Sequence, residues 1–248
     1  FKQKTAYEIM PSLVGSEMCI RDSEIGQAFR AEKFHTRRHV SEYLSVDMEM
    51  AWIDSEEDVL KVLEGLTMYI LKSCKKDGIF REAGVEIKIP KTPFKRLTYD
   101  EVLEILAKHG VEIEWGNDLE DKDEKLFGQI LAKKGYEWYF IKRYPAKIKP
   151  FYIMMDGKYS RGFDFDYRGM ELASGGQREH RYDVLVKVMR EKGLNPESFK
   201  FYLDAFRYGM PPHGGFGFGI ERFIEQLTNV LDIKEAILFP RTPEQLIP

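Results

Sequence analysis

The chain has 248 residues, of which 43% are hydrophobic and 32% are charged. This composition is typical of one large globular domain with its own core, and it excludes an intrinsically disordered chain. The formal net charge of −3 argues against a protein that holds nucleic acid by bulk positive charge, although it leaves room for a local basic patch.

Cysteine content and hydropathy exclude further classes. Cys19 and Cys74 form no CxxC pair and have no histidine at metal-ligand spacing, so neither a disulfide framework nor a zinc site is expected. No apolar run approaches the roughly 18 residues of a membrane span, and no signal-peptide pattern opens the chain. We therefore expect a cytoplasmic protein with no membrane partner.

The first segment differs in texture from the rest. Residues 4–23 mix turn formers and apolar residues without a clear period, and in wording they resemble the translated read-through of a sequencing adaptor. We expect them to be a non-native segment and leave them out of the fold argument. The domain is expected to begin at residue 24.

The first regular elements are a strand and three helices. "SVDMEMAW" alternates apolar and mostly acidic residues up to Trp52, which predicts a strand with one buried face and one acidic face. Apolar residues at helical spacing predict helices over 54–76, 98–110 and 120–134. Asp54 or Ser55 is the candidate N-cap of the first helix. Thr98 with Glu101 forms a capping box for the second.

Strand-like runs follow in "YEWYFIKRYP", "PFYIMM" and "GFDFDYRGMELASGG". Helices are predicted again over 181–193 and 195–209, the latter with Asn195 as its N-cap. Strands at hairpin spacing, without obligatory intervening helices, indicate an α+β fold with a mostly antiparallel β-sheet flanked by helices. A helical insertion is expected at about 91–135.

The segment "HGGFGFGIER" carries alternating glycines at 215, 217 and 219. It matches neither a Walker loop nor a GxGxxG fingerprint. Alternating glycines leave one face of a strand without side chains, so that a flat ligand can approach the backbone; a bulged or tightly packed strand is the alternative. Arg222 favours the ligand, because a cation in the first turn of a helix is unfavourable unless an anion is nearby.

The segment "FRAEKFHTRRHVSEYLSVDMEM" combines Arg30 with a basic loop and a strand that bears Tyr43 and Asp47. A second strand region supplies further carboxylates, at Asp164, Asp166 and Glu171. Arginine with several carboxylates suits magnesium and a polyphosphate, since the metal needs oxygen ligands and the phosphates need bidentate donors. A solvated loop beside a solvated strand face is the simpler alternative.

These residues also match a family. Residues 24–52 resemble motif 2 of the class II aminoacyl-tRNA synthetases, and residues 211–227 resemble motif 3. Between them, "MELASGGQREH" and "YLDAFRYGMPPHGG" are similar to the aspartyl branch in its archaeal type. The resemblance covers about residues 24–248 as one catalytic domain. It implies activation of L-aspartate with ATP and Mg2+, followed by transfer to the 3′ end of tRNA(Asp).

The resemblance also implies residue roles. Arg30 would hold the α-phosphate of ATP, and Arg222 would reach the γ-phosphate while forming an adenine sandwich with Tyr43. The implied ATP site further includes Glu32, His39, Glu171 and Gly219. The implied amino-acid pocket consists of Lys2, Asp47, Ser174 and Arg178. In that pocket Asp47 binds the ammonium group and Arg178 the side-chain carboxylate. The implied magnesium ligands are Asp164, Glu171 and Ser174. His213 stays open between a functional and a structural role, whereas His109 and His180 are expected to be ordinary helix-end or loop residues.

The chain departs from the family at its beginning. The anticodon-binding barrel and motif 1 have no counterpart, and residues 1–3 resemble the end of a substrate-pocket segment. We therefore expect a fragment impaired in dimerisation and activity, whereas the full-length protein is expected to be a homodimer.

The amino-acid specificity has alternatives. "GGQRE", "RYDVL" and "FPRTP" lean toward the asparaginyl branch, whereas "KPFY" and "YGMPPHGG" lean toward the aspartyl branch. Charging of both tRNA(Asp) and tRNA(Asn) also stays open. An RNA-independent asparagine synthetase is disfavoured by the basic loop, which suits an acceptor stem. A non-catalytic paralogue would usually lack Arg30, Glu171 or Arg222.

Overall fold

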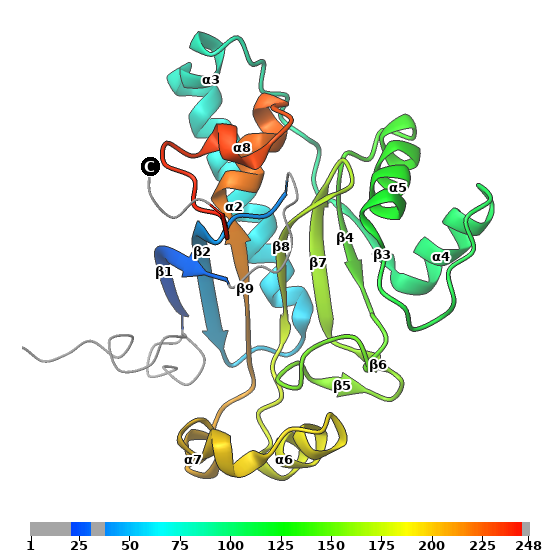
Figure 1. The fold of residues 1–248 in the computed structure, drawn as a ribbon, viewed down its shortest axis with the longest axis vertical. Coiled ribbons are helices and arrows are strands. Elements are labelled where there is room, and N and C mark those ends of the chain that lie inside the picture. Colours follow the sequence, from blue (N-terminus) through cyan, green and yellow to red (C-terminus); the bar gives the residue numbers. More distant parts are fainter. Residues whose placement is uncertain (1–20, 31–37, 245–248) are drawn as a thin grey trace, which may run out of the picture.

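The structure is a computed structural model that describes residues 21–30 and 38–244 (Figure 1). The strands are β1 (Arg21–Phe29), β2 (Glu42–Ala51), β3 (Lys95–Thr98), β4 (Trp138–Lys142), β5 (Met155–Asp156), β6 (Tyr159–Ser160), β7 (Gly162–Tyr167), β8 (Met170–Gln177) and β9 (His213–Gly219). The helices are α2 (Glu56–Asp77), α3 (Ile79–Glu82), α4 (Tyr99–Ala107), α5 (Asp121–Lys133), α6 (Tyr182–Glu191), α7 (Lys200–Arg207) and α8 (Ile220–Thr228), with short 3-10 turns η1 (Pro196–Phe199) and η2 (Ile233–Ala236).

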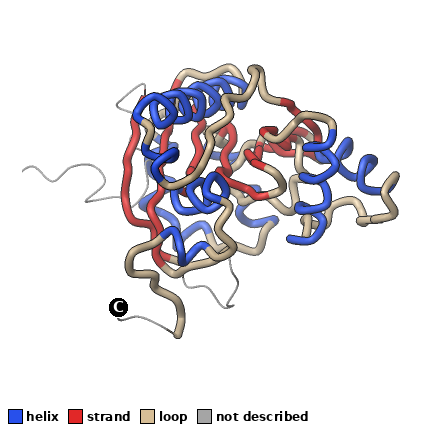
Figure 2. The backbone as a smooth tube through the Cα atoms, turned by 90° about the horizontal axis from the view of Figure 1, so that it is seen from above, coloured by secondary structure: helices blue, strands red, loops and turns tan. Residues whose placement is uncertain are grey.

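A seven-stranded sheet in the order β1-β2-β9-β8-β7-β4-β3 forms the centre of the fold. Its neighbours pair antiparallel except β3 and β4, which are parallel, and β5 with β6 forms a separate small hairpin. Helices lie on both sides of the strands when the molecule is seen from above (Figure 2). The α+β prediction with a mostly antiparallel sheet is confirmed.

Strand register gives the sheet two different faces, because paired residues point to the same side. One row across β2, β9, β8 and β7 is apolar and consists of Val46, Phe218, Ala173 and Phe165. The next row points to the other side and consists of Asp47, Gly217, Ser174 and Asp164. The apolar face packs against α2, whose Leu60 and Leu63 are fully buried. The polar face is therefore the one available for a site.

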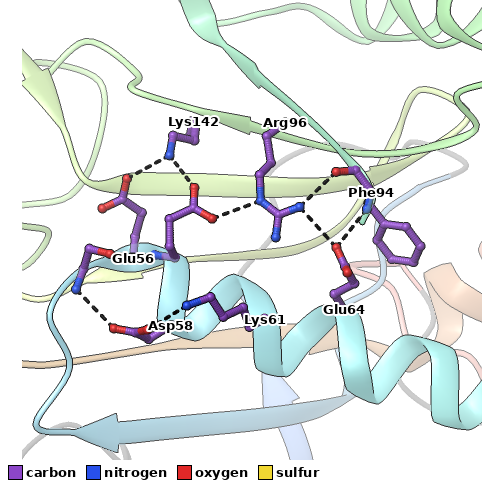
Figure 3. Close-up of polar contacts among 9 residues, drawn as sticks. Glu56, Asp58, Lys61, Glu64, Phe94, Arg96 and Lys142 are labelled. Carbon is purple, nitrogen blue, oxygen red and sulfur yellow. Dashed lines mark hydrogen bonds and ion pairs between the residues drawn. The ribbon is translucent and has the colours of Figure 1, made fainter. Parts of the chain in front are cut away.

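Helix α2 is fixed at both ends and along its length. Ser55 and Asp58 form its capping box, and Gly78 ends it in the left-handed conformation at φ 75°. Along the helix, Glu56 and Glu64 pair with Lys142 of β4 and Arg96 of β3 (Figure 3). These ion pairs tie the helix to the β3–β4 edge of the sheet.

Helices α4 and α5 lie beside the same edge (Figure 1) and share a second apolar core with β3 and β4. Tyr99 and Phe127 are fully buried there. The capping box of Thr98 and Glu101 is present as predicted. The insertion expected to be helical also contributes strand β3. Helices α6 and α7 form a third cluster beyond one end of the sheet.

Two local predictions are wrong. Trp52 was expected on the buried face of the strand, but β2 ends at Ala51. The side chain of Trp52 is 72% exposed, and its backbone has a positive φ of 60°. The backbone N–H of Trp52 donates to the carbonyl of Pro212 at 2.7 Å, which turns the chain toward α2. The run 150–154 is a turn instead of a strand, since Pro150 has no N–H to donate and its carbonyl accepts from Ile153 at 3.2 Å.

Strand β1 begins at Arg21, so residues 21–23 of the segment expected to be non-native pair with β2. The remainder of the segment expected to be non-native lies outside the described residues, so its origin stays a prediction. Across the two described ranges, no helix combines the length and apolarity that crossing a membrane requires.

Candidate active site

A cavity of about 320 Å³ lies over the polar face of the sheet. Its floor includes Gly217 and Gly219 of β9, beside Asp47 of β2 and Ser174 of β8. A Cβ atom at Gly217 would lie 3.0 Å from Oδ1 of Asp47, whereas one at Gly219 would meet no atom closer than 3.7 Å. The predicted bare strand face is therefore present at Gly217 and Gly219, which border the cavity. At Gly215 the alternative of tight packing holds, because a Cβ atom there would lie 2.0 Å from the carbonyl oxygen of Met48.

Most of the predicted site residues meet around this cavity. Those that line it are Arg30, His39, Tyr43, Asp47, Glu171, Ser174, Arg178, Gly219 and Arg222. They come from segments far apart in the chain and are gathered by the β2-β9-β8 pairing. Asp164 does not line the cavity and is buried, with 8% of its surface exposed. Lys2 and Glu32 lie outside the described residues.

One end of the cavity carries two arginines. The guanidinium of Arg30 lies 5.7 Å from the ring centre of Tyr43. Arg222 sits in the first turn of α8, as predicted, and its Nη1 donates to the carbonyl oxygen of Glu171 at 3.1 Å and lies 3.9 Å from the Glu171 carboxylate. That carboxylate is an anion of the kind that the position of Arg222 required.

Carboxylates are crowded beside these arginines. Burial raises the pKa of Glu171, and the neighbouring Asp164 raises it further, against the lowering effect of Arg222. Burial also raises the pKa of Asp166 well above its ordinary range, with Glu124 contributing in the same direction. The raised pKa values show that these carboxyl groups are costly to ionise, chiefly because they are buried and also because they lie close to one another.

Lys149 neutralises part of that charge. Its Nζ donates to both carboxylate oxygens of Asp164, at 2.8 and 2.7 Å, and lies 3.9 Å from the ring centre of Tyr144. Burial alone would lower the pKa of Lys149, but Asp164 outweighs burial and raises it. Lys149 lines the cavity and separates it from Asp164.

The predicted magnesium ligands fit the ion in part. Among the described residues, no three acidic, histidine or cysteine side chains are grouped as a ready metal site. Magnesium commonly takes only one or two protein carboxylates, with water and substrate phosphates completing its octahedron. Glu171, a carboxylate that lines the cavity and lies 3.9 Å from Arg222, suits that requirement, whereas both oxygens of Asp164 are already bound by Lys149.

The other end of the cavity is built around Arg178. Its Nε and Nη2 donate to Oε1 and Oε2 of Glu49 at 3.1 and 3.2 Å, and its guanidinium lies 5.5 Å from the ring centre of Tyr152. Burial would lower the pKa of Arg178, but Glu49 raises it instead. Nearby, Asp47 accepts a hydrogen bond from Ser45 Oγ at 2.6 Å.

Glu49 and Lys149 are cavity residues that the sequence did not identify. Glu49 lies in the predicted acidic strand face, two residues after Asp47, so the period of two contained a signal for it. Lys149 lies between two segments interpreted as strands, and no local pattern separates it from other surface lysines.

The histidines divide into two groups. His39 lines the cavity, as the resemblance implied. His213 is fully buried, with Nδ1 2.9 Å from the carbonyl of Pro211 and its ring 6.1 Å from that of Phe206, which supports the structural interpretation. His109 lies at the exposed end of α4, with Nδ1 2.8 Å from the carbonyl of Ile105.

The fold and the cavity place the chain among known enzymes. Residues 20–243 match the family described as tRNA synthetases class II (D, K and N). The chain belongs to this family.

Individual relatives agree with the family. The chain is 52% identical over 234 residues to an aspartate–tRNA(Asp) ligase of Pyrococcus abyssi, and 47% identical over 228 residues to an aspartate–tRNA(Asp/Asn) ligase of Methanopyrus kandleri. Each match covers 91% of this chain, but only 53% and 52% of the relative. The chain thus spans about half the length of these curated relatives.

Solved structures give the same result. An aspartyl-tRNA synthetase of Entamoeba histolytica superposes with a TM-score of 0.87 at 34% identity, covering 95% of this chain and 50% of the other. An asparaginyl-tRNA synthetase of Pyrococcus horikoshii in complex with asparaginyl-adenylate also gives 0.87, at 33% identity, covering 95% and 56%. The fold alone therefore does not separate the aspartyl from the asparaginyl branch.

Proposed function

We propose that this chain is the catalytic domain of an aspartate–tRNA ligase. In this proposal it activates L-aspartate with ATP to aspartyl-adenylate and transfers the aspartyl group to the 3′ end of tRNA(Asp). The observation that carries the proposal is that one cavity is lined by Arg30 and Arg222 at one end and by Asp47 and Arg178 at the other. Curated relatives that are 52% and 51% identical in sequence to this chain, and are named aspartate–tRNA(Asp) ligases, support the same assignment.

The arginine-rich end suits the nucleotide. Activation is an in-line attack of the amino-acid carboxylate on the α-phosphorus, and it needs positioning and charge neutralisation without a protein nucleophile. Arg30 is assigned to the α-phosphate, where it would stabilise the charge that develops in the transition state. Tyr43 and Arg222 are assigned to the two sides of the adenine ring, and Arg222 also to the departing phosphates.

Glu171 would hold magnesium, with Ser174 nearby, and the metal would neutralise phosphate charge when it is bound. Asp164 is also assigned to the magnesium site, and its carboxylate is held by Lys149. The low cysteine content supports a cytoplasmic location. A homodimer of the full-length protein stays a prediction that light scattering would test.

The other end suits an amino acid with a polar side chain. Asp47 is exposed to the cavity and is assigned to the ammonium group. Arg178 is assigned to the side-chain carboxylate of aspartate, since a guanidinium binds a carboxylate with two parallel hydrogen bonds. Because Glu49 already neutralises Arg178, the pair can present a donor and an acceptor together. This observation keeps asparagine as the second candidate substrate.

The test is amino-acid-dependent exchange of pyrophosphate into ATP. It uses the full-length gene recovered from source DNA across residues 3–24, so that the origin of residues 4–23 is checked in the same experiment. Exchange with aspartate but not asparagine is the expected result. Exchange with asparagine alone would move the protein to the neighbouring branch, and exchange with neither would contradict both.

A single substitution tests the nucleotide end. Arg30→Ala should lower adenylate formation on the order of a hundred- to a thousandfold, the usual loss for one transition-state donor. The reason is that the α-phosphate would lose the positive charge assigned to it at the moment charge develops. Near-normal turnover in this variant, measured by the same exchange, would remove Arg30 from the mechanism.

A further inference from the structure

Arg38 sits in a junction that none of the assigned roles uses. Its side chain is almost completely buried, and its Nη2 donates to the carbonyl oxygen of Gly169 at 3.2 Å. Its Nη1 donates to Oε2 of Glu124 at 3.1 Å and lies 3.0 Å from Oδ1 of Asp121. One guanidinium thus joins three segments: the chain that leads into β2, the β7–β8 turn and helix α5.

The other two segments of this junction are packed backbone against backbone. A Cβ atom at Gly128 of α5 would lie 2.3 Å from the backbone nitrogen of Gly169. Gly169 has φ +84°, and a Cβ there would lie 2.4 Å from the carbonyl oxygen of Glu124. Only glycine fits at either position, so no side chain separates helix α5 from the β7–β8 turn. The turn is therefore in direct backbone contact with the helix.

Both segments that Arg38 connects continue directly into the nucleotide end of the cavity. Arg38 is followed at once by His39 and, on β2, by Tyr43, both of which line the cavity. Gly169 is followed on β8 by Glu171, which also lines it. Arg38 itself lines the cavity beside His39, and its hydrogen bonds fix the distance between two of the cavity walls.

We propose that Arg38 is a positioning residue for ATP, which sets the β2 wall of the nucleotide end against the β8 wall and takes its own position from helix α5. The proposal rests on the proposed function for the identity of the nucleotide. It assigns a role in substrate positioning to α5, a helix that contributes no residue to the cavity.

The chemistry of the side chain matters here. A planar guanidinium can bind a carbonyl and two carboxylates in fixed directions, whereas the ammonium group of lysine is a point charge on a flexible stem. Charge alone would be preserved in Arg38→Lys, but the geometry of the junction would not. A positioning role therefore requires the fixed directions of the guanidinium hydrogen bonds, whereas charge compensation of Glu124 and Asp121 requires only a positive charge.

The test compares Arg38→Ala, Arg38→Lys and Arg168→Ala in the full-length protein. Arg168 is the matched control because it lies in the same turn but pairs on the surface with Glu137. The readouts are the KM values for ATP and aspartate in pyrophosphate exchange, direct ATP binding by calorimetry without amino acid, and the thermal midpoint.

Both Arg38 variants should weaken ATP binding and raise the KM for ATP on the order of tenfold or more, while the KM for aspartate changes less than about twofold. Arg168→Ala should leave both KM values unchanged. Equal losses for ATP and aspartate, or full rescue by lysine, would reduce Arg38 to a structural residue and overturn the proposal. So would wild-type ATP binding in folded Arg38→Ala.

Failure of the proposed function looks different. In that case the wild-type protein itself would show no exchange with either amino acid, whereas calorimetry would still compare ATP binding between the wild type and the Arg38 variants. A double substitution with Glu124→Gln gives a further check. The two changes should be less than additive in their effect on ATP binding if Arg38 takes its position from α5.

Discussion

Two charged regions on opposite sides of the sheet are built in opposite ways. The α2 ion-pair network joins α2 to β3 and β4 and consists of Glu56, Glu57, Glu64, Arg96 and Lys142 (Figure 3). The acidic cluster lies on the cavity side and consists of Glu124, Asp164, Asp166 and Glu171. In the network, each carboxylate has a cation within 3.3 Å.

The pKa values of the two regions move in opposite directions. Burial alone would raise the pKa of Glu57, but Lys142 and Arg96 outweigh burial and lower it. In the acidic cluster, burial raises the pKa of Glu124 to about 7 even though Arg38 opposes the shift. Burial and neighbouring carboxylates raise the pKa of Asp166 as well.

The difference separates charges that stabilise the fold from charges held for a ligand. A network in which every group is paired contributes to stability and needs nothing else. A buried cluster of carboxyl groups with raised pKa values is costly to ionise in the ligand-free protein, and a bound cation lowers that cost. The cluster lies beside the end of the cavity assigned to magnesium and ATP, where such a cost is useful.

The largest effect is expected where a paired charge inside the cavity loses its partner. Glu49→Gln should destabilise the ligand-free protein by about 3–5 kcal/mol, because Arg178 would then be a buried charge without its carboxylate. Denaturant unfolding measures this loss. Saturating aspartate should recover part of it if the substrate carboxylate replaces Glu49. An unchanged unfolding midpoint would show that water compensates Arg178.

The next effect comes from the acidic cluster and depends on pH. The pKa of Glu124 in the folded protein, about 7, exceeds its ordinary value of 4.5, so the folded state binds the proton more tightly than the unfolded state. The stabilisation that comes from binding this proton is present at acidic pH and is lost as the pH rises through about 7. Burial is the largest cause of this raised pKa; of the charged groups that face Glu124, Arg38 lowers the pKa, whereas Glu171 and Asp121 raise it.

Glu124→Gln should therefore stabilise the ligand-free protein at pH 8, by up to about 3 kcal/mol, and have little effect near pH 5. The measurement is denaturant unfolding of both proteins across this range. A stability difference that does not change with pH would show that Glu124 has an ordinary pKa. Asp183→Asn, in the first turn of α6 and distant from the cluster, is a suitable control.

The sequence predicted the parts of this comparison that depend on local pattern. Helical spacing identified α2, α4 and α5, and alternation identified the acidic face of β2. The glycines of β9 indicated the bare strand face at Gly217 and Gly219, and the anion expected beside Arg222 is the Glu171 carboxylate. The α+β class followed from the hairpin spacing of the strands.

The pairings themselves could not be predicted, because they join residues that only the sheet brings together. Arg178 and Glu49 are 129 positions apart, and Arg38 and Glu124 are 86 apart. Such contacts depend on the register between β2, β9 and β8, which no single strand encodes. The error at Trp52 has the same origin, since the carbonyl of Pro212 ends the strand from across the fold.

The smallest effect is expected in the α2 ion-pair network, which is partly open to solvent. Arg96 donates to Glu57 and Glu64 at 3.0 and 3.2 Å and lies over the ring of Phe140 at 5.4 Å. Arg96→Met keeps most of the packing on Phe140 and should cost about 1–2 kcal/mol at neutral pH.

The pKa of Glu57 is lowered in the folded protein, so its ion pairs stabilise the fold above the ordinary pKa of 4.5, and this stabilisation is lost as the pH falls through the lowered value. The cost of Arg96→Met should therefore disappear in acid. Salt should also reduce it, since exposed pairs are screened. The measurement is the unfolding midpoint of both proteins at pH 7 and pH 3, with and without added salt. Pyrophosphate exchange should stay at the wild-type level, because the network faces away from the cavity. A loss of exchange would mean that the two sides of the sheet are coupled, and the separation between stabilising and ligand-directed charges would then fail.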